Sequence, residues 1–320
     1  MTLLRPITVV LSCAALLAGA PKLTQADVEG LLRSLSNWGR WGKADQLGAL
    51  NLITPQKRKQ AAALVREGRP VSLAHDVIKE RADDSPPFEH TMLETGRAGS
   101  GGASDKIAVQ YHGFTATHMD ALCHMFWKGQ MYNGYPQAEV TAKGAARLGV
   151  NRFRDGIFTR GVLIDLPRLA GRKYLEGTRA ITPEDLDAWE KKFKTTVQPG
   201  DAVLFRTGRW ARRAAEGPWP IMKNSAGLHA SCLKWLKQRD VSVVGSDLAT
   251  DVMPSQVEGI VLPVHLVLIV GMGVPILDNL DLEAAAVEAA SRNRWEFLLT
   301  VSPLPVEGGT GSPVNPTAVF

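Results

Sequence analysis

The sequence predicts an α/β protein, because short apolar runs typical of buried strands alternate along the chain with segments that carry helix signals. The clearest strands are expected at residues 161–165, 202–205, 241–244 and 297–301. No internal repeat is evident in this alternation. The composition, with 45% hydrophobic and 22% charged residues, is ordinary for a globular protein. One large domain is therefore expected.

The predicted helices have recognisable starts. Thr54-Pro55 and Thr182-Pro183 each place a hydroxyl N-cap before a proline at the first helical position. Another helix is expected at residues 228–236, with His229 on its polar side. A fourth is expected at residues 263–270, with His265 in its first turn, followed by an extended segment that leads to Asp278.

The charge pattern gives no indication of a nucleic-acid partner. The 37 basic and 32 acidic residues leave a net charge of +5, and the basic residues are spread along the chain. The densest group, within residues 206–213, is interpreted as a solvated helix face, with steering of an anionic substrate as the functional alternative. Three cysteines do not form a disulfide framework. Cys123 is expected to be an ordinary thiol, although a soft ligand or nucleophile is the alternative.

Residues 1–26 are predicted to be a signal peptide, which leaves residues 27–320 as the folded domain. Arg5 gives a positive start, residues 7–20 are largely apolar, and Thr24-Gln25-Ala26 is a small-residue cleavage site. The apolar stretch is too short to cross a membrane, so no membrane association is expected. The predicted location is periplasmic or secreted. The alternative is a frayed first helix in a cytoplasmic enzyme.

The segment 111–124 carries the chemistry, because it holds three of the seven histidines and one aspartate. His118 and Asp120 are two residues apart, so on a strand they share one face at roughly 6.6 Å. A bend after Asp120 would bring His124 back to the same centre. Mixed nitrogen and oxygen ligands suit zinc or manganese. The alternative is a hydrogen-bonded core histidine beside a capping aspartate.

Residues 117–124 resemble the H-x-G-T-H-x-D-x-x-x-H motif of the cyclase-like metal-dependent hydrolases, a family that includes bacterial kynurenine formamidases and isatin hydrolases. The segments 41–52, 200–208, 263–280 and 308–313 are similar to other motifs of that family, in the same order. The resemblance covers about residues 38–320. It implies the swivelling β/β/α cyclase-like fold, a small-molecule substrate and a homo-oligomer.

The resemblance also implies a chemistry. In that family one or two divalent metals, zinc or manganese, activate water for attack on an amide, imide or lactone carbonyl. Carried over by position, His118 is expected to be a metal ligand and Asp120 a ligand able to bridge two metals. His265 and Asp278 match the late metal ligands, and His124 matches the proton donor and acceptor.

Three positions depart from the family pattern. Phe114 stands where the family usually has a histidine, Ala116 where it often has glycine, and Asp278 where the late acid is usually glutamate. The change at Phe114 leaves three alternatives: the site loses a ligand, His112 reaches in through a bulge as a metal ligand, or only one metal binds.

Further expectations concern the surroundings of the site. Trp38, Trp41 and Phe114 are candidate aromatic walls for a planar substrate. The glycine- and serine-rich loop 97–104 is a candidate lid. Two other functions stay open, a metal-dependent lyase or cyclase and a non-catalytic periplasmic binding protein with a degenerate metal site.

Overall fold

The computed structural model describes residues 20–320, so most of the predicted signal peptide lies outside the described residues. The first described helix, α1 (Gln25–Ser34), is capped by Thr24, whose side chain accepts a hydrogen bond from the Asp27 backbone. Val28, Leu31 and Leu32 of this helix are buried in the core. A cut after Ala26 would remove the cap and part of the first turn, and an N-cap typically contributes about 1 kcal/mol.

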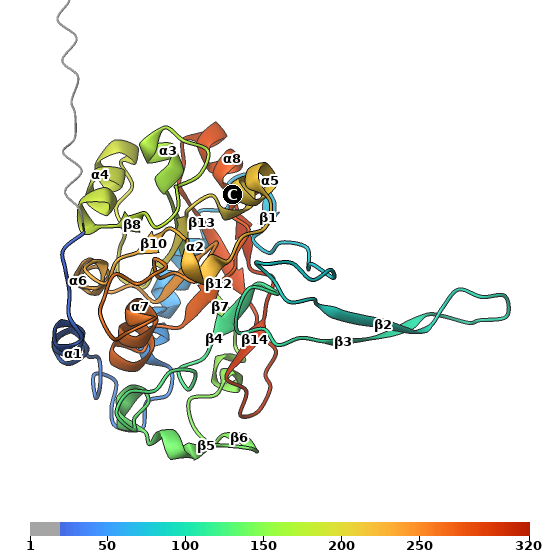
Figure 1. The fold of residues 1–320 in the computed structure, drawn as a ribbon, viewed down its shortest axis with the longest axis horizontal. Helices are drawn as coiled ribbons and strands as arrows, with labels where there is room; N and C mark the ends of the chain where they lie inside the picture. The colour runs from blue at the N-terminus through green and yellow to red at the C-terminus, as the bar shows by residue number, and fades with distance from the viewer. Residues whose placement is uncertain (1–19) are drawn as a thin grey trace, which may run out of the picture.

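A nine-stranded mixed sheet organises the described chain (Figure 1). Its central strands β7, β9, β11 and β12 run parallel, and every outer pairing is antiparallel. In spatial order the strands are β1 (Pro70–Ser72), β15 (Thr317–Val319), β13 (Glu296–Val301), β7 (Ile157–Asp165), β9 (Ala202–Arg206), β11 (Val243–Ser246), β12 (Ile276–Asp278), β4 (His118–Asp120) and β14 (Gly311–Pro313). The expected strands at 202–205 and 297–301 match closely. The one expected at 161–165 is the second half of β7, which begins four residues earlier, and the one expected at 241–244 begins two residues later.

Helices pack on this sheet and supply the connections between the parallel strands. They are α2 (Pro55–Ala62), α3 (Leu166–Ala170), α4 (Pro183–Phe193), α5 (Arg209–Glu216), α6 (Cys232–Gln238), α7 (Pro263–Leu266) and α8 (Glu283–Arg292). The predicted starts of α2 and α4 are confirmed: the Thr54 hydroxyl accepts from the Lys57 backbone, and the Asp185 side chain accepts from the Thr182 backbone. A π-helical turn, Val267–Met272, continues α7.

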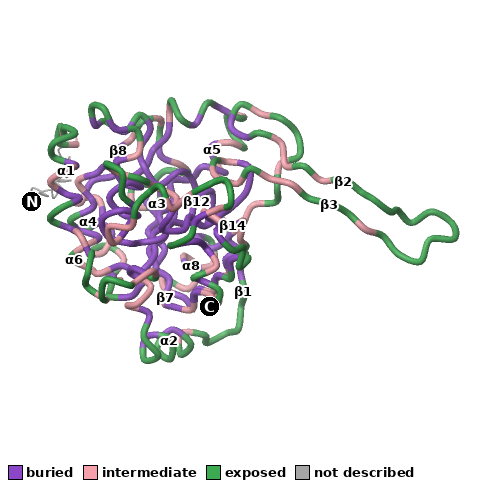
Figure 2. Tube along the Cα trace, turned by 90° about the horizontal axis from the view of Figure 1, so that it is seen from below, coloured by how far each residue is buried: buried purple, intermediate pink, exposed green. Residues whose placement is uncertain are grey.

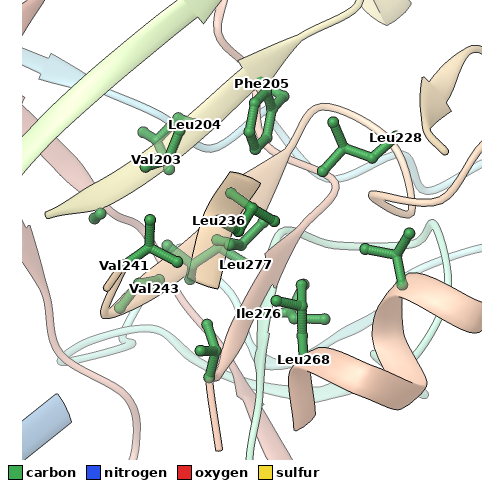
Figure 3. Packing of buried hydrophobic residues seen from close by; sticks show 14 of the residues in the cluster. Val203, Leu204, Phe205, Leu228, Leu236, Val241, Val243, Leu268, Ile276 and Leu277 are labelled. Carbon is green, nitrogen blue, oxygen red and sulfur yellow. The ribbon is translucent and has the colours of Figure 1, made fainter. Parts of the chain in front are cut away.

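The hydrophobic core lies between the parallel strands and the helices beside them (Figure 3). Val243 of β11 and Leu277 of β12 point to one face of the sheet, whereas Phe205 of β9 points to the other. These three residues, Leu236 of α6 and Leu268 of the π-helical turn are all buried members of one core cluster. Each such side chain contributes roughly 1.5–3 kcal/mol when removed from water. This packing makes the sheet rigid where the site is built.

The predicted start of the helix at residue 228 is wrong. Gly227–Leu228 forms β10, which pairs with β8 (Ala180–Ile181), and α6 begins only at Cys232. The chain is extended here because Leu228 also bridges to Asp251, and Gly227 lies so close that an added Cβ would sit 2.4 Å from the Asp251 carbonyl. His229 is consequently fully buried instead of lying on a polar helix face.

The arginine group at residues 206–213 is not a solvated face. Arg206, Arg209 and Arg212 are all buried. Arg206 bonds to Asp165 at 2.9 Å and to Glu283 at 2.7 Å. The spacing of the arginines does not predict their burial, because a buried cation requires acidic partners and these come from distant parts of the sequence.

A long hairpin projects away from the body of the molecule. It consists of β2 (Glu89–Glu94) and β3 (Ser104–Ala108), and most of its residues are exposed (Figures 1 and 2). The glycine-rich loop at 97–104 is the tip of this hairpin. The lid hypothesis is therefore wrong for the site of the same chain, because the loop lies far from it. A second small hairpin pairs β5 (Val140–Thr141) with β6 (Gly144–Ala145).

Within residues 20–320, no helix combines the length and the apolar character needed to cross a bilayer.

Candidate metal centre

The candidate centre begins with two adjacent antiparallel strands, β4 and β12. Their register sets Asp278 directly opposite His118, and Ile276 opposite Asp120. Directly opposed residues on one face have Cβ atoms roughly 5 Å apart, close enough for both side chains to reach one ion. The same edge lies beside the carboxyl end of β11, where ligands commonly bind in open α/β sheets.

Asp120 is the hub of the site, and its carboxylate is buried. Its Oδ1 lies 2.9 Å from His112 Nδ1 and 3.5 Å from His118 Nε2. Its Oδ2 lies 3.8 Å from His124 Nε2 and also 3.8 Å from His265 Nε2. Four imidazoles thus converge on the two oxygens of one carboxylate. Asp278 completes the group, with Oδ2 3.0 Å from His265 Nε2.

His124 returns to Asp120 through a tight turn. The His124 backbone N–H donates to the Ala121 carbonyl at 3.0 Å, directly after β4. The predicted course of the chain, a strand that ends at Asp120 followed by a bend, matches this geometry, although the bend is a turn and not a helix.

His112 enters from an irregular segment that precedes β4, not from a bulge in a strand. Its Nε2 is 2.9 Å from the Thr310 hydroxyl, which leaves Nδ1 facing Asp120. Its ring stacks on that of His124 at 3.8 Å, nearly parallel. Phe114, two residues later, packs instead against a separate apolar group of Trp219, Ile221 and Leu248. Of the alternatives left by Phe114, the geometry therefore favours His112 over loss of a ligand.

The donor set fits a cation. His112 Nδ1 and Asp120 Oδ1 are buried and have no hydrogen-bond partner among the described residues, although they face each other at 2.9 Å. Buried polar atoms without partners are rare and usually mark an ion or a water. The candidate ligands form two groups, and within each group the ligand atoms lie within 4.8 Å of one another. The first group is His112, Asp120 and His124, and the second is His118, Asp120 and Asp278, so Asp120 belongs to both. Nitrogen and carboxylate donors suit zinc or manganese.

The electrostatics of the cluster keep Asp120 ionised. Burial raises the pKa of Asp120, but His124, His112 and His118 outweigh it and hold this pKa well below its usual range. Burial lowers the pKa of His124 to about 4, against the opposing effect of Asp120. Burial also lowers the pKa of His265, but Asp278 and Asp251 outweigh it and raise that pKa well above its ordinary value.

Three residues near the centre were not predicted from the sequence. Asp251 accepts from His265 Nδ1 at 2.6 Å, Thr250 donates to Asp278 Oδ1 at 3.0 Å, and Thr310 contacts His112. A signal for the first two was present, because four of the six residues 246–251 (Ser246, Asp247, Thr250 and Asp251) are polar and follow the apolar run of β11. Polar residues at the carboxyl end of a parallel strand are candidates for a site.

A family model described as "Putative cyclase" matches residues 47–252. The chain belongs to this cyclase family. A crystal structure described as a novel cyclase has 32% sequence identity and a TM-score of 0.79, covering 90% of this chain and 99% of that one. The fold is thus the cyclase-like fold that the sequence motifs predicted.

More distant structures share the fold. Isatin hydrolase A from Labrenzia aggregata has 20% identity and a TM-score of 0.57, over 81% of this chain and 96% of that one. An isatin hydrolase bound to the product analogue thioisatinate has 19% identity and a TM-score of 0.56, over 84% and 98%. No curated protein matches the sequence.

Proposed function

We propose that the protein is a metal-dependent hydrolase that acts on a small amide, imide or lactone carbonyl. The observation that carries this proposal is the pair of ligand groups that share Asp120. Its support from relatives is the fold shared with isatin hydrolases, one of them bound to a product analogue. The substrate of this chain is then a small molecule with a hydrolysable carbonyl.

His118, Asp120, His265 and Asp278 would hold a divalent cation, and His112 with Asp120 would contribute to a second position. Bound there, zinc or manganese would supply an activated water near neutral pH and polarise the carbonyl. The ionised Asp120 faces His112 and His118 with Oδ1 and His124 and His265 with Oδ2, so its carboxylate can contribute to both groups. His118 is oriented for this role, since its Nδ1 lies 3.0 Å from the Ala116 carbonyl and its Nε2 faces Asp120.

His124 is the proposed acid and base. Its side chain is 24% exposed, whereas those of His118 and Asp120 are almost fully buried, so it borders the space that a substrate can enter. With a pKa of about 4 its imidazole is neutral at pH 7 and able to accept a proton from water. The same ring then returns the proton to the leaving nitrogen or oxygen. Because it also belongs to one ligand group, the alternative is that it binds metal.

The test separates ligands from the acid/base. His118→Ala and Asp120→Ala should each lose stoichiometric metal together with turnover of a panel of N-formylkynurenine, isatin, cyclic imides and lactones. His124→Ala should keep its metal while kcat falls about 10²–10⁴-fold, the usual contribution of a general acid/base. His90→Ala, a histidine on the projecting hairpin, is the matched control and should change neither quantity. Unchanged metal content in both ligand variants would refute the proposal.

A lyase or ring-closing reaction is the second candidate, favoured by the name of the family. Hydrolysis places one oxygen atom from solvent in the product, whereas a lyase or cyclase does not. Turnover in ¹⁸O-labelled water, read by mass spectrometry, distinguishes the two. Tight ligand binding without turnover across the panel would instead favour a binding protein.

The cellular location and the oligomeric state of the protein are also proposals. The predicted signal sequence supports a periplasmic or secreted location, tested by fractionation of cells that express the full chain. A homo-oligomer is supported by the projecting hairpin, on which Leu93 and Ile107 are 63% and 62% exposed. Apolar side chains at this exposure on an arm that does not pack against its own body favour contact with a second copy.

A further inference from the structure

We infer that Thr250 and Asp251 are positioning residues that fix the geometry of the late ligand pair, Asp278 and His265. This inference rests on the proposed metal-dependent function and goes beyond it, because neither residue is a ligand. Each holds one ligand by the atom that faces away from the centre. The two are neighbours in sequence, so one short segment sets both ligands at once.

The segment that carries them is firmly held. The Leu228 N–H donates to the Thr250 carbonyl at 2.8 Å, and the Val252 N–H donates to the Leu228 carbonyl at 3.1 Å. Gly227 approaches Asp251 so closely that no larger residue fits. Thr250, Asp251 and Val252 are all buried. Backbone hydrogen bonds to β10 therefore hold the segment in place.

Asp251 orients His265. Its Oδ2 accepts from His265 Nδ1 at 2.6 Å, and its two oxygens also accept from the backbone N–H groups of Val264 and His265 at 2.7 and 3.1 Å. When the ring gives up its second proton to bind an ion, Asp251 keeps the remaining proton on Nδ1 and leaves the lone pair on Nε2, which faces Asp278 at 3.0 Å and Asp120 at 3.8 Å. A carboxylate behind a histidine ligand both fixes the ring and increases its basicity.

Thr250 orients Asp278. Its hydroxyl donates to Oδ1 at 3.0 Å, so Oδ2 is the oxygen that meets His265. The Thr250 backbone has φ +53°, a left-handed conformation that β-branched residues rarely adopt. Such conformations persist where the surroundings enforce them, and they cluster at functional sites. Asp278 has a shorter side chain than the glutamate usual in the family, so its reach is limited. The hydroxyl of Thr250, by holding Oδ1, fixes Oδ2 toward the candidate centre.

The competing explanation is purely structural, with Asp251 acting only as a cap for the start of α7. The chain offers a matched control for this explanation. Asp247, four residues earlier and also buried, accepts from the backbone N–H groups of Thr207, Gly208 and Arg209 at the start of α5. It contacts no candidate ligand among its hydrogen-bond partners. Asp247, which caps a helix only, can thus be compared with Asp251, which caps a helix and also holds the candidate ligand His265.

The experiment measures Co²⁺ binding to the metal-free full chain, by visible absorption and by competition with a chelator. Asp251→Asn should weaken Co²⁺ binding about 10–100-fold and shift the absorption bands, because the ring orientation and basicity of His265 change. Thr250→Val, which keeps the shape and removes the hydroxyl, should weaken binding about tenfold. Thr250→Ser should restore it. Asp247→Asn should lower thermal stability and leave the affinity and the spectrum unchanged.

The outcomes separate this inference from the proposed function. If wild-type protein binds Co²⁺ and both Asp251→Asn and Thr250→Val bind it with the same affinity and spectrum, the positioning role is overturned while the metal site stands. A spectrum altered equally by Asp247→Asn would likewise overturn it. If wild-type protein binds no Co²⁺, the proposed function itself fails, and the inference fails with it.

Discussion

Cys123 lies next to His124 in the sequence, yet its environment makes it inert. The side chain is buried, and burial raises the pKa of its thiol to about 12. At pH 8 only about one thiol in ten thousand is then a thiolate, the form that reacts. A nucleophilic or metal-binding role for this thiol, left open by the sequence, does not fit this environment.

Thiol labelling of a Cys13→Ser variant checks this at the level of the residue. The folded variant should show no fast reaction at pH 8, because Cys232 is also buried with a raised pKa, and it should gain two reactive thiols in denaturant. Modification of Cys123 in the folded state, located by peptide mass spectrometry, would contradict the assignment.

The residues of the site differ in how far the sequence could reveal them. His118, Asp120 and His124 were predictable as a group, because a two-residue step on a strand and a following bend are local geometry. The role of Asp251 was not predictable, because its partner His265 is fourteen residues away and their contact depends on how α7 packs on the rest of the chain. The approach of His112 is not predictable from the sequence alone, because the segment that carries it has no regular structure from which to infer a direction.

Among the elements, α2 is tied to the sheet by a buried ion pair. Lys57 Nζ lies 2.5 Å from the Asp201 carboxylate, whose other oxygen meets Arg160 of β7 at 3.2 Å. Both Lys57 and Asp201 are buried. Removal of one partner from such a pair leaves a buried charge with too few partners and typically costs about 3–5 kcal/mol.

Lys57→Met should therefore lower the free energy of unfolding, measured in urea, by about 3 kcal/mol. The double variant Lys57→Met/Asp201→Asn should be less destabilised than the single one, because the unpaired charge is removed as well. Arg58→Met, the exposed neighbour on the same helix, is the control and should stay near wild type. Equal stability of Lys57→Met and wild type would show that this pair does not hold α2 in place.

The elements themselves were predictable where caps and apolar runs are local, as for α2, α4, β7 and β9. They were mistaken where tertiary contacts override local pattern. Leu228 belongs to a strand because Ile181 and residues 250–252 lie beside it, and Arg206 can be buried because Asp165 and Glu283 reach it. The sequence next to Leu228 or Arg206 gives no indication of these distant partners.

For the whole molecule, several motifs in the right order predicted the family and the fold, and the family match confirms both. The direction of the glycine-rich segment was not predictable. Flexible composition indicates a loop but not where it points, and the β2–β3 pairing directs it away from the body (Figure 2).

The projecting hairpin should be dispensable for the fold and the metal centre but required for assembly. It packs against no part of the body beyond its base, and Met92, Leu93 and Ile107 are exposed along it. Replacement of residues 92–105 by Asn-Gly joins Thr91 to Lys106, which are already paired, through a two-residue turn of the preferred type. Light scattering should show a smaller assembly for this variant, with unchanged Co²⁺ binding and a melting temperature within a few degrees. An unchanged assembly would show that the hairpin is not the contact between copies, whereas loss of Co²⁺ binding would mean that the hairpin of one chain helps to build the metal centre of another.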